Sequence, residues 1–123
     1  MNLPMKITGI VLRNVGRGKK LGFPTANIAA PQDAKDGIYL GYTNFDAKRF
    51  PSLLFIGKAV TFDETKRFAE SYILDFHGDL YGKTVEMEFV EYVRDSRRFV
   101  SGEEMKKQIA EDERIARVFF ANK

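Results

Sequence analysis

The feature that most constrains the fold is a series of short strand-like segments with turns, and no helical segment, between them. These segments are rich in β-branched and aromatic residues, and Gly, Asn and Asp bound them. Residues Asp46-Ala47 are suited to a two-residue hairpin turn. The expected strands are Lys6–Arg13, Gly37–Phe45, Lys48–Gly57, Arg67–Phe76 and Thr84–Val93. Consecutive short strands without intervening helices predict an antiparallel β-barrel rather than a parallel sheet.

One helix follows the strands. Ser101 and Glu104 form the capping box "SGEE", in which the Ser101 hydroxyl accepts from the Glu104 amide. The next residues place one mostly apolar face at helical spacing, which predicts a helix of about 15–18 residues packed on the barrel. That face comprises Met105, Ile109, Asp112, Ala116 and Phe119.

Composition narrows the possible functions. The 123 residues predict a single domain, 1–123, and the absence of cysteine excludes disulfides and thiolate metal sites. No apolar run approaches the ~20 residues of a membrane span, and the N-terminus has no secretory signal pattern. We therefore expect a cytoplasmic monomer that binds no membrane. The net charge of +3 permits an anionic ligand but is too small to require nucleic acid.

A basic glycine-rich segment, "GRGKKLG", spans Gly16–Gly22. Glycines let backbone amides approach a ligand, and successive amides form concave anion sites. The spacing matches neither the P-loop nor the dinucleotide-binding fingerprint, because Phe23 follows Gly22 and Leu21 stands where a glycine would be needed. Taken alone, such a segment is more often a solvated hairpin tip than a phosphate-binding loop.

The residues after this segment suggest a cation site. Pro24 favours an extended backbone at Phe23, so Thr25 and Asn27 are expected to project to the same side. Their neutral oxygens suit Mg²⁺ that takes its other ligands from water and substrate phosphates. Both residue types also bond neighbouring backbone readily, and for this pair alone that explanation is favoured.

Glu70 is the one acidic residue on an expected strand face that also carries Phe68, Tyr72, Leu74 and Phe76. An unpaired carboxylate among apolar side chains is unfavourable, and burial should raise its pKa. Such a group is a candidate general base. The alternative is that this end of the face is open to water, and the strand pattern does not decide between the two.

In order and spacing, several segments together resemble the riboflavin kinase family. They are "LGFPTANI", "GIYLGY", "IGKAVTF", "AESYILDFHGDLYGK" and "RDSRRFVSGEEMKKQIAED". The resemblance runs from about Thr8 to Arg117. It implies a mainly β fold, a six-stranded antiparallel Greek-key barrel with a C-terminal helix. It also implies transfer of the γ-phosphate of ATP to the 5′-hydroxyl of riboflavin, with FMN and ADP as products.

The resemblance assigns roles residue by residue. Glu70 becomes the catalytic base, and Thr25 and Asn27 hold the metal, Mg²⁺ with Mn²⁺ or Zn²⁺ as alternatives. The flavin-side residues are Arg94, Arg97 and Phe99. The nucleotide-side residues are Asn14, Gly16, Arg17, Gly18, Lys19, Lys20, Gly22, Pro24, Thr25, Asn27, Ile73, Asp75 and Tyr81.

Some positions depart from the family pattern. Asn14 replaces a glycine, Lys19 an arginine, Val60 a proline and Phe55 an asparagine, and Asp95-Ser96 replaces Pro-Glu. They motivate one alternative, a catalytically degenerate flavin- or nucleotide-binding protein. A second alternative is a single-stranded nucleic-acid-binding barrel. The chain contains no His-x-Gly-His motif, so FMN rather than FAD is the expected product.

Overall fold

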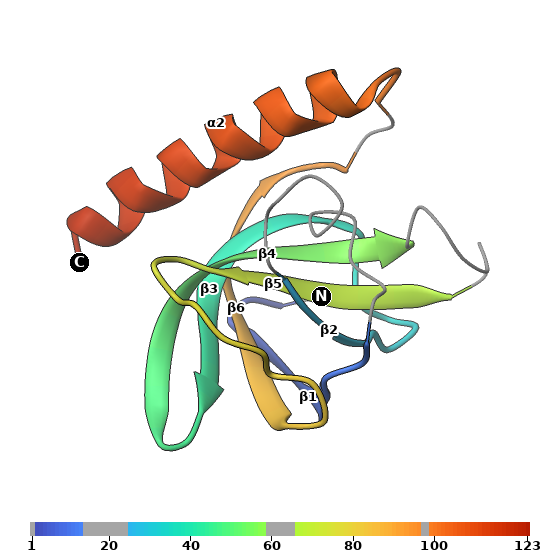
Figure 1. Cartoon of the computed structure of the whole chain (residues 1–123), viewed down its shortest axis with the longest axis vertical. Helices are drawn as coiled ribbons and strands as arrows, with labels where there is room; N and C mark the ends of the chain where they lie inside the picture. Colours follow the sequence, from blue (N-terminus) through green and yellow to red (C-terminus); the bar gives the residue numbers. More distant parts are fainter. Residues whose placement is uncertain (1, 14–24, 59–65, 97–98) are drawn as a thin grey trace.

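In the computed structural model, six strands form one sheet and a single long helix follows them (Figure 1). The structure describes residues 2–13, 25–58, 66–96 and 99–123. The elements are β1 Met5–Ile10, β2 Ala26–Ala29, β3 Gly37–Phe45, β4 Lys48–Lys58, β5 Arg67–Ile73, β6 Thr84–Arg94 and α2 Gly102–Ala121.

The strand order is β1-β6-β3-β4-β5-β2, and every pairing is antiparallel. Strands β3, β4 and β5 follow one another directly, and β6 returns to lie beside β3, which is a Greek-key arrangement. Just beyond the end of β1, the Leu12 amide donates to the Asn27 carbonyl of β2 over 2.8 Å, which bridges the two edges of the sheet. The predicted six-stranded antiparallel Greek-key barrel with a C-terminal helix is confirmed.

The β3–β4 hairpin turns at the two residues that the sequence indicated. Asp46 and Ala47 both have positive φ, 52° and 60°. Two successive residues in this region match the twist of the flanking strands. The turn fixes the register Phe45↔Lys48, and with it the rest of the longest hairpin.

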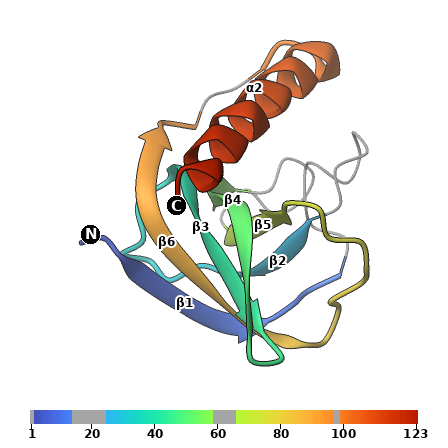
Figure 2. The same ribbon diagram turned by 90° about the vertical axis from the view of Figure 1, so that its left-hand side faces the viewer.

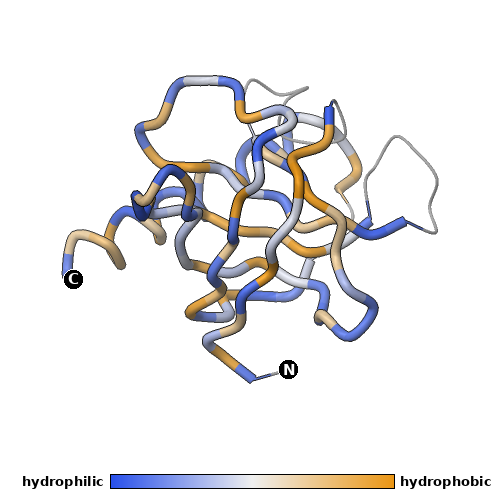
Figure 3. The backbone as a smooth tube through the Cα atoms, turned by 90° about the horizontal axis from the view of Figure 1, so that it is seen from below, coloured by the Kyte–Doolittle hydropathy of each residue, from blue (hydrophilic) through white to orange (hydrophobic). Residues whose placement is uncertain are grey.

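Side chains on the two faces of the sheet pack into two different cores. The barrel interior holds a cluster that includes Tyr39, Leu54 and Phe89. The second cluster lies on the outer face under the helix and includes Leu40, Leu53 and Ala116. Figure 3 shows hydrophobic and hydrophilic residues alternating along much of the backbone, as strands with two distinct faces require.

Strands β3 and β6 approach so closely at Gly41 that no side chain fits between them. A Cβ on Gly41 would collide with the Glu88 carbonyl oxygen, at a position where the β3–β6 register shifts. The sheet bends at this irregularity, which helps an open sheet curl into a barrel.

Helix α2 lies outside the barrel, along one side of it (Figure 1 and Figure 2). The Ser101 side chain accepts from the Glu104 amide over 3.1 Å, so the predicted cap is confirmed. The helix has 20 residues rather than the expected 15–18, because apolar contacts continue through Phe119 and Phe120 onto the outer cluster. Within the part of the chain that the structure describes, no helix is long and apolar enough to cross a membrane.

Several expected strand ends need correction. Strand β1 begins at Met5 rather than Lys6, and it stops at Ile10 rather than Arg13 because Val11 and Leu12 donate instead to Lys83 and Asn27. Strand β5 stops at Ile73 rather than Phe76, because Asp75 adopts a positive φ of 58°. Strands β4 and β6 each continue one residue further than expected.

Candidate functional site

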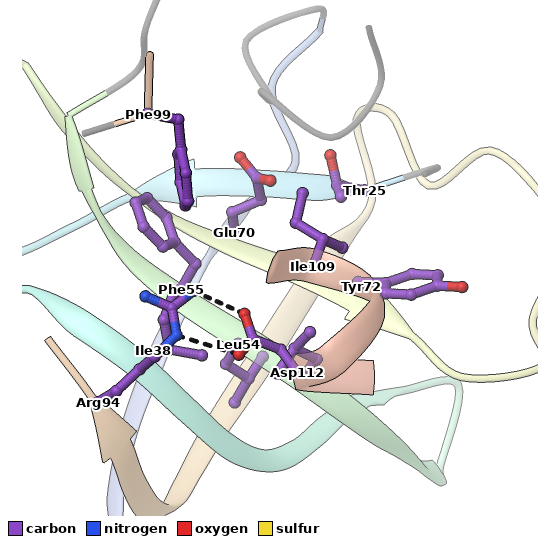
Figure 4. A pocket seen from close by; sticks show the side chains of 11 residues that line it. Thr25, Ile38, Leu54, Phe55, Glu70, Tyr72, Arg94, Phe99, Ile109 and Asp112 are labelled. Atoms are coloured by element: carbon purple, nitrogen blue, oxygen red, sulfur yellow. Dashed lines mark hydrogen bonds and ion pairs between the residues drawn. The ribbon is translucent and has the colours of Figure 1, made fainter. Parts of the chain in front are cut away.

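A pocket of about 490 Å³, counting its open mouth, lies between the outer wall of the barrel and helix α2 (Figure 4). Most of its lining is apolar, and a few polar side chains converge on it, which is the usual character of a small-molecule site. The lining residues are Thr25, Ile38, Leu53, Leu54, Phe55, Glu70, Tyr72, Arg94, Phe99, Ile109 and Asp112.

Glu70 reaches this pocket from the middle of β5. Its neighbours in sequence, Ala69 and Ser71, are buried, and Ala69 belongs to the interior cluster, so Glu70 points to the outer face. The residue is only 9% exposed. Figure 4 shows the Glu70 carboxylate and the Thr25 hydroxyl pointing the same way. Burial beside apolar walls fits the expectation of a base, and its raised pKa stays a prediction.

Thr25 and Asn27 present two buried oxygens that lack partners. Thr25 Oγ1 and Asn27 Oδ1 have no hydrogen-bond partner among the described residues. Buried polar atoms are nearly always satisfied, so each of these oxygens needs a partner from outside the described residues, and a bound ligand would be one such partner. Asn27 also lies directly opposite Glu70 in the β2–β5 register.

These neutral oxygens fit a hard divalent cation. The described residues contain no group of three or more His, Asp or Glu side chains that could hold a metal alone. A cation here would therefore complete its shell with water and with the phosphates of a nucleotide, the pattern typical of Mg²⁺. The expected assignment of Thr25 and Asn27 to a metal is consistent with this arrangement and stays a prediction.

On the opposite wall, Arg94 is held by the helix. Its Nε and Nη2 donate to the two carboxylate oxygens of Asp112 over 3.0 and 2.7 Å. Its Nη1 donates to the Asp95 carbonyl over 2.9 Å. The sequence predicts Arg94 as a flavin contact, and the structure places it in the pocket lining with these donors already engaged.

Sequence reasoning did not assign Asp112 and Phe55 to the site. Asp112 is the one charged residue on the docking face of the helix, and that is the signal that could have identified it. Phe55 pairs directly with Glu70 across β4 and β5, so both side chains project from the same face. Phe99, predicted on the flavin side, does line the pocket.

Three residues predicted on the nucleotide side lie elsewhere. Ile73 is buried in the interior cluster. Asp75 is exposed and paired with Arg117 over 3.0 Å, a hydrogen-bonded contact that holds the pKa of its carboxyl below the ordinary value. Tyr81 is 53% exposed, and the Arg13 guanidinium lies 3.9 Å from its ring centroid. None of the three lines the pocket, and their nucleotide assignment stays a prediction.

The remaining predicted site residues lie outside the described residues. They are Asn14, Gly16, Arg17, Gly18, Lys19, Lys20, Gly22, Pro24 and Arg97. The chain nevertheless places the basic glycine-rich sequence between Arg13 and Thr25, both of which are described. Its two flanks are therefore next to the Leu12–Asn27 bridge.

Comparison with protein families finds one family model that matches nearly the whole chain. The family model described as flavokinase, riboflavin kinase, matches residues 1–120. The chain belongs to the riboflavin kinase family. The resemblance first carried by the short motifs thus extends over nearly the whole chain.

Two relatives are multifunctional proteins that are much longer than this chain. The trifunctional protein RibF/MnmA of Mycoplasmoides gallisepticum is 37% identical over 120 residues, which is 95% of this chain and 18% of that protein. The bifunctional riboflavin kinase/FMN adenylyltransferase of Listeria monocytogenes is 32% identical over 98% of this chain and 40% of that protein. The chain spans less than half the length of these curated relatives.

Solved structures share the fold. A Streptococcus pneumoniae protein described as a macrolide-efflux protein aligns with a TM-score of 0.78 and 31% identity, over 93% of this chain and 38% of its own. The riboflavin kinase of Trypanosoma brucei aligns with a TM-score of 0.66 and 24% identity, over 94% of this chain and 79% of its own. The second similarity supports the barrel-and-helix fold of riboflavin kinases.

Proposed function

We propose that this chain is a riboflavin kinase that transfers the γ-phosphate of ATP to the 5′-hydroxyl of riboflavin. The observation that carries the proposal is a juxtaposition around Glu70. The buried Glu70 carboxylate lines the same apolar pocket as Thr25 and pairs with Asn27 across β5 and β2, and Thr25 Oγ1 and Asn27 Oδ1 have no partner among the described residues. Membership in the riboflavin kinase family supplies the substrate class.

The pocket supports riboflavin as the acceptor. Its walls include the aromatic rings of Phe55 and Phe99 and the aliphatic side chain of Ile109. Flat aromatic ligands pack well against such surfaces, and aromatic pairs gain about 0.5–1.5 kcal/mol beyond burial. With the flavin ring against these side chains, the ribityl chain would extend toward Glu70, at the side of the pocket that Thr25 also lines.

Thr25 and Asn27 would hold Mg²⁺, which neutralises charge on the nucleotide phosphates when bound. The basic sequence Arg17, Lys19 and Lys20 precedes Thr25 in the chain and would contribute positive charge to the same phosphates. The nucleotide then lies on the β2 side of Glu70, and riboflavin lies on the helix side. Phosphoryl transfer depends mainly on positioning and on charge neutralisation, which this division of the site provides.

The chemical step needs no covalent intermediate. The 5′-oxygen of riboflavin attacks the γ-phosphorus of ATP as the bond to the β,γ-bridging oxygen breaks. Glu70 accepts the hydroxyl proton, and ADP leaves with the electron pair of the broken bond. General-base assistance of this type contributes roughly 10²–10⁴-fold to the rate.

The experiment that tests the proposal is FMN formation from riboflavin and ATP with Mg²⁺, comparing the native chain with Glu70→Gln. We expect FMN from the native chain and a loss of roughly 10²–10⁴-fold in kcat from the variant. ATP binding should be retained, because Glu70 acts on the acceptor. Flavin or nucleotide binding without turnover by the native chain would instead support a catalytically degenerate binding protein.

The remaining expectations are tested separately. We propose a monomer in the cytoplasm that binds no nucleic acid. Sedimentation measures the oligomeric state. Oligonucleotide affinity at two salt concentrations tests the last point, since binding through phosphates falls steeply with salt.

A further inference from the structure

We propose that Asp112 is a positioning residue that fixes Arg94 and helix α2 as the riboflavin-facing wall of the pocket. This inference rests on the proposed function, because it concerns the acceptor side of that same site. Figure 4 shows the ion pair as two dashed lines between Arg94 and Asp112, on the wall formed by the helix.

Arg94 and Asp112 form a bidentate ion pair. Both carboxylate oxygens of Asp112 accept from the Arg94 guanidinium, over 3.0 and 2.7 Å. A third hydrogen bond comes from Gln108 Nε2, one turn earlier on the helix, over 3.1 Å. Paired parallel hydrogen bonds of this kind define orientation as well as distance.

The Arg94–Asp112 ion pair is largely buried. Asp112 is 2% exposed, and the Arg94 side chain is 24% exposed. A buried ion pair is weak evidence for stability, since well-packed apolar residues of the same size often stabilise as much. The apolar residues around Asp112 on the helix face, such as Ile115 and Ala116, show that an apolar residue is compatible with this surface. The presence of a carboxylate at Asp112 is therefore better explained by its orienting the Arg94 guanidinium than by stability.

The pair joins two elements that both border the pocket. Arg94 is the last residue of β6, and the chain continues from it to Phe99 and then to the helix. Ile109 lies three residues before Asp112 and faces the pocket too. A shift of the helix at Asp112 would therefore displace the Ile109 and Phe99 side chains together, and with them the surface offered to a flavin ring.

A second ion pair between helix and barrel provides the contrast. Arg117 contacts Asp75 over 3.0 Å, but both groups are largely exposed and neither lines the pocket. A pair of this kind contributes little to stability and does not touch the acceptor site. The Arg117–Asp75 pair therefore only attaches the helix to the barrel, whereas the Arg94–Asp112 pair also sets the position of the pocket wall.

The test compares Asp112→Asn and Arg94→Lys with the native chain. Asp112→Asn keeps the side-chain volume but removes the negative charge. Arg94→Lys keeps the positive charge but removes the paired hydrogen bonds of the guanidinium. Glu111→Gln is the matched control, because Glu111 is exposed and forms an ion pair with Arg114 on the same helix. Three quantities are measured for each chain: Tm, riboflavin affinity by flavin fluorescence titration, and the separate KM values for riboflavin and ATP.

Both pair variants should weaken riboflavin binding and raise its KM roughly tenfold to a hundredfold, as a displacement of about 1 Å does. The KM for ATP should stay within about twofold of the native value, because the Arg94–Asp112 pair is not expected to couple to the nucleotide site. The control should match the native chain. Asp112→Glu, which retains a carboxylate, should recover part of the riboflavin affinity.

Equal changes in both KM values, or a lower Tm with unchanged riboflavin affinity, would overturn the inference and leave Asp112 a purely structural residue. If Asp112→Asn does not fold, Arg94→Lys and Gln108→Leu are judged by the same criterion. Failure of the proposed function is distinguishable, because in that case the native chain itself forms no FMN, whether or not it binds riboflavin.

Discussion

Asn27 and Glu70 are directly opposite each other on the antiparallel strands β2 and β5. Register partners project from the same face with Cβ atoms about 4.5–5.5 Å apart. The unpartnered amide oxygen of one and the carboxylate of the other therefore belong to one site, although 42 residues separate them in the sequence. The strand register, rather than a loop, sets the spacing between the proposed metal position and the proposed base.

The unpartnered hydroxyl predicts an unusual response at Thr25. Thr25→Val removes a buried oxygen that has no partner among the described residues, a kind of group whose burial is unfavourable by about 1–3 kcal/mol. Without metal, the Tm of the variant should equal or exceed that of the native chain, while FMN formation at fixed Mg²⁺ falls. Thr43→Val is the matched control, because the Thr43 hydroxyl bonds to Ser52 and Ser71 over 2.8 and 2.5 Å. The control should lower Tm, and a lower Tm in both variants would contradict the assignment of Thr25.

Gly41 is expected to tolerate no side chain. In Gly41→Ala the new Cβ would meet the Glu88 carbonyl, which is backbone and cannot rotate away. We expect a loss of more than about 4 kcal/mol in the free energy of unfolding, the range of exceptional substitutions. Gly82→Ala is the control, because a Cβ there meets nothing within 4 Å and the φ of 78° adds only about 1–2 kcal/mol. Urea unfolding of both variants measures the difference, and similar midpoints would show that the β3–β6 contact can yield.

The Asp75–Arg117 pair predicts a pH-dependent contribution to stability. Hydrogen bonding to Arg117, and then its charge, lowers the pKa of Asp75 below 3.8, so the fold favours the ionised carboxylate. That contribution is present at neutral pH and is lost as the pH falls through the lowered pKa. Arg117→Gln should therefore lower Tm at about pH 7 more than at about pH 2. Thermal unfolding at the two pH values in low salt measures this, and a pH-independent difference would mean that the ion pair is not its source.

The helix cap predicts a smaller loss of stability. Ser101→Ala removes the oxygen that accepts from the Glu104 amide and should lower the free energy of unfolding by about 1 kcal/mol. Ser101→Asp retains an acceptor and should restore most of that stability. Denaturant unfolding followed by circular dichroism checks both, and an unchanged midpoint for the alanine variant would show that the first turn frays in the native chain.

Local patterns in the sequence were sufficient for most of the fold. The turn at Asp46-Ala47 and the Ser101 cap depend on neighbouring residues, and both are confirmed. The expected strands are confirmed apart from some of their ends. The end of β5 was wrong because Asp75 adopts a positive φ that ends the strand. Asp tolerates this region better than most residues, but the alternating apolar residues on both sides of Asp75 favoured a longer strand. Phe76, expected on the face of Glu70, instead packs against Phe45 and Phe50.

The candidate site was only partly predictable, because some of its contacts depend on tertiary packing rather than on local sequence. Thr25, Asn27 and Glu70 carry chemistry that local residue types suggest, and the β2–β5 pairing brings Asn27 and Glu70 together. The partnership of Arg94 with Asp112 depends on where a helix meets a strand end, and the two residues lie 18 positions apart in the sequence. Such a contact arises from tertiary packing, which composition and periodicity do not encode.

The bridge between Leu12 and Asn27 has a consequence for how this barrel can evolve. The Asn27 carbonyl joins the two edge strands, and the amide oxygen of the same residue is the proposed metal ligand. A substitution that shifts the Asn27 backbone therefore changes barrel closure and ligand geometry together. Selection for substrate use and selection for foldability therefore act on one residue.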